Sequence, residues 1–105
     1  MSTVPVVAII RAKPGKEKAL ADVLKQLVAE THKEPGCVRY ALHTSQADAR
    51  DFVFVERWKS AQDLQSHLAA PHIAEAMARK EELIDAINIM PLASVPVDNS
   101  EMETF

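Results

Sequence analysis

The feature that most constrains how this chain can fold is a strand-like segment near its start that is apolar on both faces. Residues 4–13, VPVVAIIRAK, alternate so that one face carries Val6, Ala8, Ile10 and Ala12 and the other carries Val7 and Ile9. Such a strand needs cover on both faces, because large apolar patches are seldom left exposed on monomeric proteins. The rest of the chain must supply this cover, alone or with a partner.

The next elements follow from the spacing of apolar residues. Residues 16–33 repeat apolar positions every three or four residues, which predicts an amphipathic helix. Pro35 and Gly36 should end this helix, because proline disfavours a helical residue before it and glycine permits a turn conformation. CVRYALHTS (37–45) and FVFVERW (52–58) alternate with period two around the polar turn QADARD, which predicts a β-hairpin.

A second helical region follows the hairpin. SAQD (60–63) has the form of a capping box, in which Ser60 accepts from a backbone amide and Asp63 reaches back to the cap. Pro71 interrupts the helix. The segment after it carries a helical stripe made of Ile73, Ala76, Met77, Lys80, Ile84 and Ile87. Strand character returns in INIMPLASV (87–95).

The order strand, helix, strand, strand, helix, strand predicts an α+β fold of the ferredoxin-like βαββαβ type. This topology gives a four-stranded antiparallel sheet with the helices on one face. The other face is apolar and bare, so we expect a second sheet to cover it. We assign residues 1–95 to this domain and residues 96–105, which are polar and acidic, to a C-terminal tail.

Composition narrows the classes of partner. The chain has 105 residues, enough for one domain, and a net charge of −3 with scattered basic residues, which argues against nucleic-acid binding. Its single cysteine, Cys37, can form no intrachain disulfide and no thiolate metal site, and we expect it to be buried. We find no run of about 18 apolar residues and no signal-peptide pattern, so we expect a cytoplasmic protein without a membrane partner.

Two histidines in HLAAPHIAEAMARK (67–80) are the main candidates for chemistry. His72 follows Pro71 at the expected start of a helix, where the positive end of the helix dipole disfavours a charged imidazole. A neutral imidazole can accept a proton from a phenolic or enolic substrate, so we expect His72 to be a general base. The alternative is a helix-start residue bonded to the backbone. His67 is typical of a packed or surface histidine, and only the break at Pro71 could bring both rings to one site.

The third strand offers a possible ligand surface. Trp58, Phe54 and Glu56 share one of its faces, and Tyr40 lies on the preceding strand. Aromatic walls with one carboxylate suit a flat aromatic ligand. The alternative makes the aromatic residues core anchors and pairs Glu56 with Arg39 or Arg57 across the hairpin. The four histidines match no common metal motif, and two glycines in the whole chain make no phosphate loop, so we expect no metal and no cofactor.

EPGCVRYALH (34–43) followed by FVFVERWKSAQDLQSHLAAPHI (52–73) closely resembles the antibiotic-biosynthesis monooxygenase domain, particularly its small quinol monooxygenase-like members. The similarity runs from about Val4 to Val95. This resemblance implies a homodimer whose two sheets face each other as a dimeric α+β barrel, with a pocket enclosed in each subunit. It also implies oxygen chemistry on an electron-rich aromatic substrate without flavin, haem or metal.

The same resemblance separates the candidate functions. Haem-degrading relatives use an Asn, a Trp and a His where this chain has Ala8, His67 and Met77, which disfavours haem degradation. We therefore expect a cofactor-independent monooxygenase that oxidises a quinol or similar aromatic, with His72 as base and Glu56 or His67 as orienting groups. Other relatives are isomerases of autoinducer processing, so a small-carbonyl isomerase stays an alternative. A non-enzymatic dimer that binds an apolar ligand is the third possibility.

Overall fold

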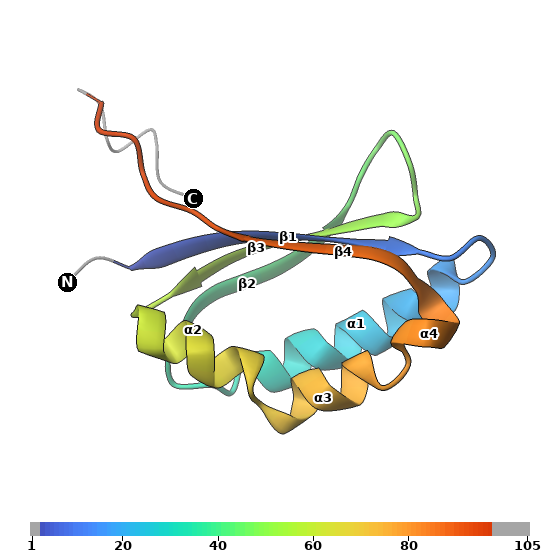
Figure 1. Ribbon diagram of the computed structural model, residues 1–105, viewed down its shortest axis with the longest axis horizontal. Helices are drawn as coiled ribbons and strands as arrows, with labels where there is room; N and C mark the ends of the chain where they lie inside the picture. The colour runs from blue at the N-terminus through green and yellow to red at the C-terminus, as the bar shows by residue number, and fades with distance from the viewer. Residues whose placement is uncertain (1–2, 98–105) are drawn as a thin grey trace.

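The computed structural model describes residues 3–97, and the predicted tail lies mostly outside this range. Its strands are β1 (Val4–Ala12), β2 (Cys37–Thr44), β3 (Asp51–Trp58) and β4 (Ile84–Pro91). Its helices are α1 (Glu17–Thr31), α2 (Ala61–Leu68), α3 (Pro71–Met77) and α4 (Lys80–Leu83). The sheet order is β2-β3-β1-β4 with every neighbouring pair antiparallel, and all helices lie on one side of it (Figure 1). The predicted ferredoxin-like fold is confirmed.

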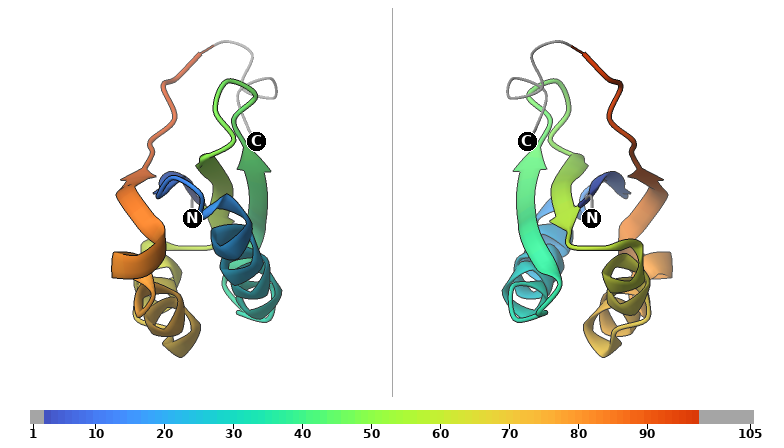
Figure 2. Two further views of the ribbon diagram at one scale, coloured as in Figure 1. Left: turned by 90° about the vertical axis from the view of Figure 1, so that its right-hand side faces the viewer. Right: turned by 90° about the vertical axis from the view of Figure 1, so that its left-hand side faces the viewer.

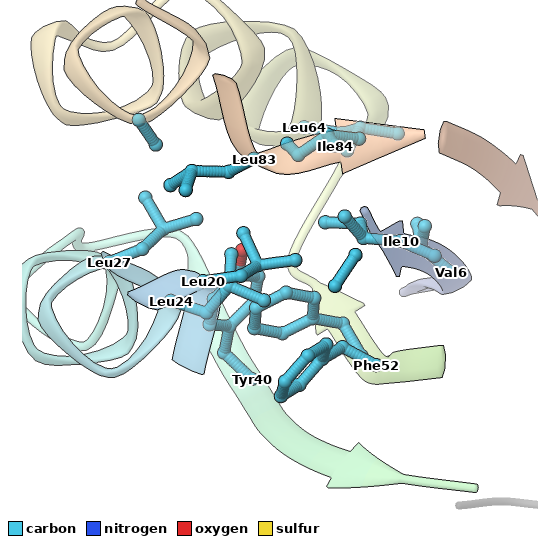
Figure 3. Packing of buried hydrophobic residues seen from close by; sticks show 14 of the residues in the cluster. Val6, Ile10, Leu20, Leu24, Leu27, Tyr40, Phe52, Leu64, Leu83 and Ile84 are labelled. Carbon is cyan, nitrogen blue, oxygen red and sulfur yellow. The ribbon is translucent and has the colours of Figure 1, made fainter. Parts of the chain in front are cut away.

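The helices form two rows beneath the sheet. Viewed from either end, α1 makes one row and α2 with α3 makes the other (Figure 2). The apolar face of α1 buries Leu20, Leu24 and Leu27 against β-strand residues that include Ile10 and Tyr40 (Figure 3). Within residues 3–97, no helix combines the length and the apolar composition that a membrane span requires.

The helix expected after Pro71 is shorter than the apolar stripe indicated. α3 ends at Met77, α4 adds a single turn, and β4 begins at Ile84, so Ile84 and Ile87 belong to a strand. A β-bulge explains the error: Ile84 pairs with Ala12 and Ile87 with Ile10, with a shift in register between them. The extra residue lets two positions three apart face the same side of the sheet, which imitates helical spacing.

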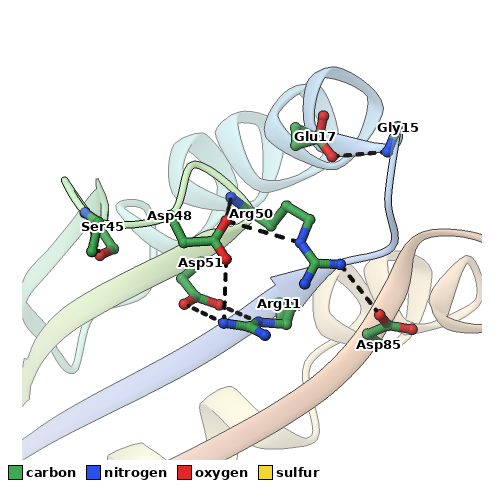
Figure 4. A network of polar contacts seen from close by, with 9 residues as sticks. Arg11, Gly15, Glu17, Ser45, Asp48, Arg50, Asp51 and Asp85 are labelled. Carbon is green, nitrogen blue, oxygen red and sulfur yellow. Dashed lines mark hydrogen bonds and ion pairs between the residues drawn. The ribbon is translucent and has the colours of Figure 1, made fainter.

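The end of the sheet where β1 leads into α1 is held by charged side chains (Figure 4). The Arg11 guanidinium donates to both carboxylate oxygens of Asp51, at 2.7 and 2.8 Å, and reaches Asp48 at 3.4 Å. This bond lowers the pKa of the Asp51 carboxyl below its ordinary value. Arg50 extends the network to Asp85 on β4 at 3.7 Å, so the β2–β3 turn, β1 and β4 are joined at this end.

The centre of the outer face of the sheet is apolar, and this face carries no helix, as expected. Its residues are partly exposed and come from all four strands: Val7, Ile9, Ala41, Val53, Val55 and Met90. Val55 lies between Val7 and Ala41 in the register, at the centre of this face. The charged network of Arg11 and Asp51 borders one end of the face.

We expect two copies to associate through this face in solution. Val55→Asp should convert a dimer to a monomer, because a charge at the centre of an apolar interface must be buried without a partner. Light scattering coupled to size exclusion should give twice the mass of one chain for the parent and one chain mass for the variant. Val38→Asp, a similar change at a residue that is 51% exposed, is the control and should stay dimeric. A parent of single-chain mass at micromolar concentration would contradict the expectation.

Candidate functional site

A cavity of about 240 Å³ lies between the sheet and the helices. Its floor is the inner face of β1 and β3 and its roof is α2 and α3; the lining residues are Ala8, Ile10, Leu27, Tyr40, Phe54, Glu56, His67, Leu68, Ile73, Met77, Ile87 and Ile89. Ala8 stands between Phe54 and Ile89 in the sheet register, so a small side chain on a central strand leaves the space open. Leu68 and Ile89 are the most exposed of the lining residues, which places the mouth between α2 and β4.

The predicted aromatic residues divide into two roles. Tyr40 and Phe54 line the cavity and stack on each other with ring centroids 4.6 Å apart. Trp58 is fully buried and packs against the His67 ring at 4.3 Å, so it supports a lining residue and does not line the cavity itself. Tyr40 also meets the His67 ring edge at 5.3 Å. His67 is therefore fixed between two aromatic rings.

Glu56 is the buried carboxyl group of the cavity. It is 4% exposed, and its Oε1 accepts a hydrogen bond from Trp58 Nε1 at 2.9 Å. Burial raises its pKa to about 7, against the weaker opposite effect of the Trp58 bond. The expected alternative partners, Arg39 and Arg57, are opposite each other on the outer face of the sheet. Pairing of Glu56 with either arginine is therefore wrong, and the carboxyl group faces the cavity.

Both candidate histidines meet at one carboxylate that the sequence interpretation missed. Glu34 Oε2 lies 2.8 Å from His67 Nδ1 and 2.6 Å from His72 Nε2. The side chains of His67, Glu34 and His72 are 3%, 15% and 17% exposed, so the cluster is largely shielded from water. His67 lines the cavity, whereas His72 lines a separate groove between α1 and α3.

Two local features of the chain bring these three segments together. Pro71 starts α3 after Ala70, whose extended backbone separates α3 from α2 and lets the His67 and His72 rings approach to 6.2 Å. Gly36 lies directly against Asp63 at the start of α2, where a Cβ atom would overlap the Asp63 carboxylate. Gly36 is thus needed for this close approach, which fixes the Glu34 loop beside α2. In the sequence, the feature that could have indicated Glu34 was the glycine two residues after it.

The start of α2 confirms most of the predicted cap. Ser60 has an extended backbone and its Oγ accepts from the Asp63 backbone amide at 3.1 Å. The Asp63 carboxylate accepts from the Ser60 hydroxyl at 2.8 Å rather than from the Ser60 amide. The cap fixes the direction of α2, and with it the position of His67 seven residues later.

The shared oxygen determines which ring nitrogens carry protons. A carboxylate in its ionised form can only accept, so with Glu34 in that form both nitrogens that face it donate. Neutral His67 then has its proton on Nδ1, and its Nε2, on the other side of the ring, is left as an acceptor. Neutral His72 has its proton on Nε2. His67 is thus the histidine that combines contact with the cavity and an unprotonated nitrogen.

The environment shifts the pKa values of His67 and Glu56, which both line the cavity, in opposite directions. Burial lowers the pKa of His67, against the opposing effect of its bond to Glu34. Burial raises the pKa of Glu56 to about 7. Neutral imidazole and neutral carboxylic acid are therefore both accessible near pH 7, a pairing typical of a base and an acid in one site.

Two histidines and a carboxylate are also the donor types of many metal sites. The three donor atoms of Glu34, His67 and His72 lie within 4.8 Å of one another. Two ligands of one ion, each bound at about 2.0–2.1 Å, are usually separated by more than about 3 Å. The O–N distances of 2.6 and 2.8 Å fit shared protons better.

The fold and the site define a class of small α+β protein with an enclosed apolar cavity. The model of the family described as "Antibiotic biosynthesis monooxygenase" matches residues 3–79, and the chain belongs to this family. The resemblance stated from the sequence is confirmed.

Individual relatives agree with this assignment. Rv0793 of Mycobacterium tuberculosis is 34% identical over 83 residues, which are 79% of this chain and 81% of that protein. The "Probable quinol monooxygenase YgiN" of Escherichia coli is 33% identical over 78 residues, 65% of this chain and 75% of that protein. The crystal structure of PA3566 from Pseudomonas aeruginosa has a TM-score of 0.86 and 29% identity, covering 91% of this chain and 97% of that one. The chain spans only 51% of another relative, an uncharacterized protein of Synechocystis that is 24% identical to it over 75 residues, 71% of this chain.

The raised pKa of Glu56 predicts a pH-dependent stability. The Glu56 carboxyl binds its proton more tightly in the folded protein than in the unfolded chain. Its destabilising contribution to the folded state therefore grows from pH 4.5 to about 7 and is constant above that. Glu56→Gln should therefore be stabilised relative to the parent by up to roughly 3 kcal/mol more at pH 8 than at pH 4. Urea unfolding at both pH values measures the difference. Glu81→Gln, on the exposed surface of α4, is the control, and an equal pH response of both variants would contradict the assignment.

Proposed function

We propose that the protein is a cofactor-independent monooxygenase that oxidises a small, neutral, electron-rich phenol or quinol with molecular oxygen. One observation carries this proposal: His67 and Glu56, with pKa values moved in opposite directions by burial, face the same apolar cavity. Family membership and the name of the relative YgiN support the class of reaction. We further propose that the working form is a dimer paired through the outer sheet face.

The cavity favours a neutral ligand with one or two rings. Its volume of about 240 Å³ is below the roughly 300–1,000 Å³ of common ligand pockets. Among the described residues, its lining includes neither Lys nor Arg, so a phosphate or carboxylate group would enter without a counter-charge. Phe54 and Tyr40 offer flat walls for a ring, and Tyr40, Glu56 and His67 offer polar atoms for hydroxyl or carbonyl oxygens.

The proposed chemistry begins with removal of the phenolic proton by His67 Nε2. The resulting anion gives one electron to oxygen, and the two radicals combine to form a C–O bond at a ring carbon that carries hydrogen. A proton returned from the site completes a hydroperoxide, which loses water as the C–H bond breaks, leaving a second carbonyl group. The sum is phenol plus O₂ giving quinone plus water, so the protein supplies a base, an acid and a dry cavity.

Glu34 and Glu56 have different parts in this scheme. Glu34 stabilises the imidazolium that forms on His67, through a bond that already exists at 2.8 Å. Protonated Glu56 can donate to the substrate oxygen that becomes negative or to the peroxide. Its raised pKa makes this protonated form available near neutral pH.

Oxygen uptake with a panel of one- and two-ring quinols separates the candidate functions. Uptake above the autoxidation rate, with one oxygen atom incorporated from ¹⁸O₂, supports the monooxygenase. Conversion of a small carbonyl compound without oxygen uptake would support the isomerase alternative. Ligand binding without turnover of any compound would support the non-enzymatic binder.

We expect His67→Ala to lower kcat for an accepted quinol by roughly 100-fold or more, because a positioned base contributes on this scale. The residue to compare is Gln65, an exposed residue of the same helix α2 that does not line the cavity, whose replacement by alanine should leave turnover unchanged. Oxygen-electrode kinetics give the rates. Circular dichroism checks folding, and the mass in solution from light scattering checks assembly. Full activity in a folded His67→Ala protein would contradict the assignment of the base.

A further inference from the structure

We infer that His72 and Glu34 are positioning residues: Glu34 fixes the tautomer of His67, and His72 holds Glu34 in place. This inference rests on the proposed function for its kinetic consequences. The part that assigns the ring protons of His67 and His72 rests on the geometry of the cluster alone. It also changes the role expected for His72 from the sequence, where this residue was the base.

The position of His72 argues for an anchor. Its Nε2 bonds to Glu34 at 2.6 Å, and its ring lines the groove between α1 and α3 rather than the cavity. Its Nε2 is thus committed to the Glu34 carboxylate, and His72 is not among the residues that line the cavity. His72 can still act on catalysis through the position of Glu34.

Glu34 needs such an anchor because of where it lies. Its backbone is held at both ends of a tight turn, by the bond of its amide to the Thr31 carbonyl at 3.0 Å and of the Cys37 amide to its own carbonyl at 3.1 Å. Its side chain, in contrast, forms hydrogen bonds only with the two imidazoles among the described residues. Two donors from different helices fix both the direction of the carboxylate and the oxygen it presents.

The tautomer of His67 depends on this arrangement. If an ionised carboxylate faces Nδ1, the proton stays there and Nε2 can accept; if a donor faces Nδ1, the proton moves to Nε2 and the base is lost. The rings of Trp58 and Tyr40 pack against the His67 ring, and among the described residues the hydrogen-bond partner of Nδ1 is Glu34. Glu34 is therefore the group that sets the proton of His67.

Amide substitutions separate an anchor from a base. The side-chain nitrogen of Gln lies about as far from Cβ as His Nε2, so His72→Gln can still donate to Glu34 but cannot act as a base. We expect His72→Gln to keep kcat within roughly fivefold of the parent and His72→Ala to lose about tenfold or more, with KM little changed in both. Glu34→Gln should lose roughly 100-fold or more, because its amide can donate to His67 Nδ1.

His67→Asn is the matched comparison for these variants. Its amide nitrogen can replace Nδ1 as a donor to Glu34, yet it offers no base, so it should be folded and as inactive as His67→Ala. Equal loss in His72→Gln and His72→Ala would overturn the anchor and make His72 itself the base. Full activity in both His72 variants would also overturn it.

Nitrogen-15 NMR of the imidazoles tests the proton assignment in the free protein, without turnover. The parent should show the proton of His67 on Nδ1 and that of His72 on Nε2, and Glu34→Gln should move the His67 proton toward Nε2. A parent in which neutral His67 is protonated on Nε2 would overturn the inference. A parent that oxidises no quinol would instead refute the proposed function, and the NMR result would still decide whether Glu34 sets the tautomer.

Discussion

The structure depends on one packing constraint: helices can cover only one face of this sheet, and they do so in two rows. Because α1 fills one row, the second must be built from the short segments α2 and α3, beneath the half of the sheet that contains β1 and the edge strand β4. Two short helices leave a junction at Ala70 and Pro71, and a small residue on the central strand β1, Ala8, leaves room between the sheet and the helices. The cavity and the histidine cluster both arise where this row is interrupted, so the site is a consequence of how the sheet is covered.

Burial then determines the chemistry of the groups that face this space. A carboxyl and an imidazole taken out of water both favour their neutral forms, so the same desolvation raises the pKa of Glu56 and lowers that of His67. What distinguishes the two groups is the neighbour of each. Glu56 accepts a neutral hydrogen bond from Trp58, whereas His67 bonds to a carboxylate that would stabilise its charged form. One apolar cavity thereby holds an acid and a base whose neutral forms are both accessible near pH 7.

The sequence predicted the elements whose pattern is local, and it missed the contacts that depend on distance in the fold. Alternation in β1 and β3 grouped the residues of each face correctly, with Glu56 and Trp58 on one side of β3, but it did not show which face the helices cover. The helical stripe after Pro71 failed at Ile84, because a β-bulge on a strand and a turn of helix both place residues three apart on one side. Glu34 was not predicted as a site residue. It is separated from His67 by 33 residues, and no local pattern in the sequence marks the two as partners.

The position of Glu34 also explains why two histidines of similar appearance in the sequence need not have the same role. Both rings bond to one carboxylate oxygen, but His67 lines the cavity and His72 lines the groove between α1 and α3. The Glu34 carboxylate therefore lies between the two rings: a ligand in the cavity can meet the His67 imidazole, and His72, on the side of the groove between α1 and α3, holds the carboxylate in place. The close contact of Gly36 with Asp63 keeps the Glu34 loop in position beside α2. The cluster thus combines one residue of the cavity wall, His67, with two that are held by contacts outside this wall, through Pro71 at the start of α3 and Gly36 against Asp63.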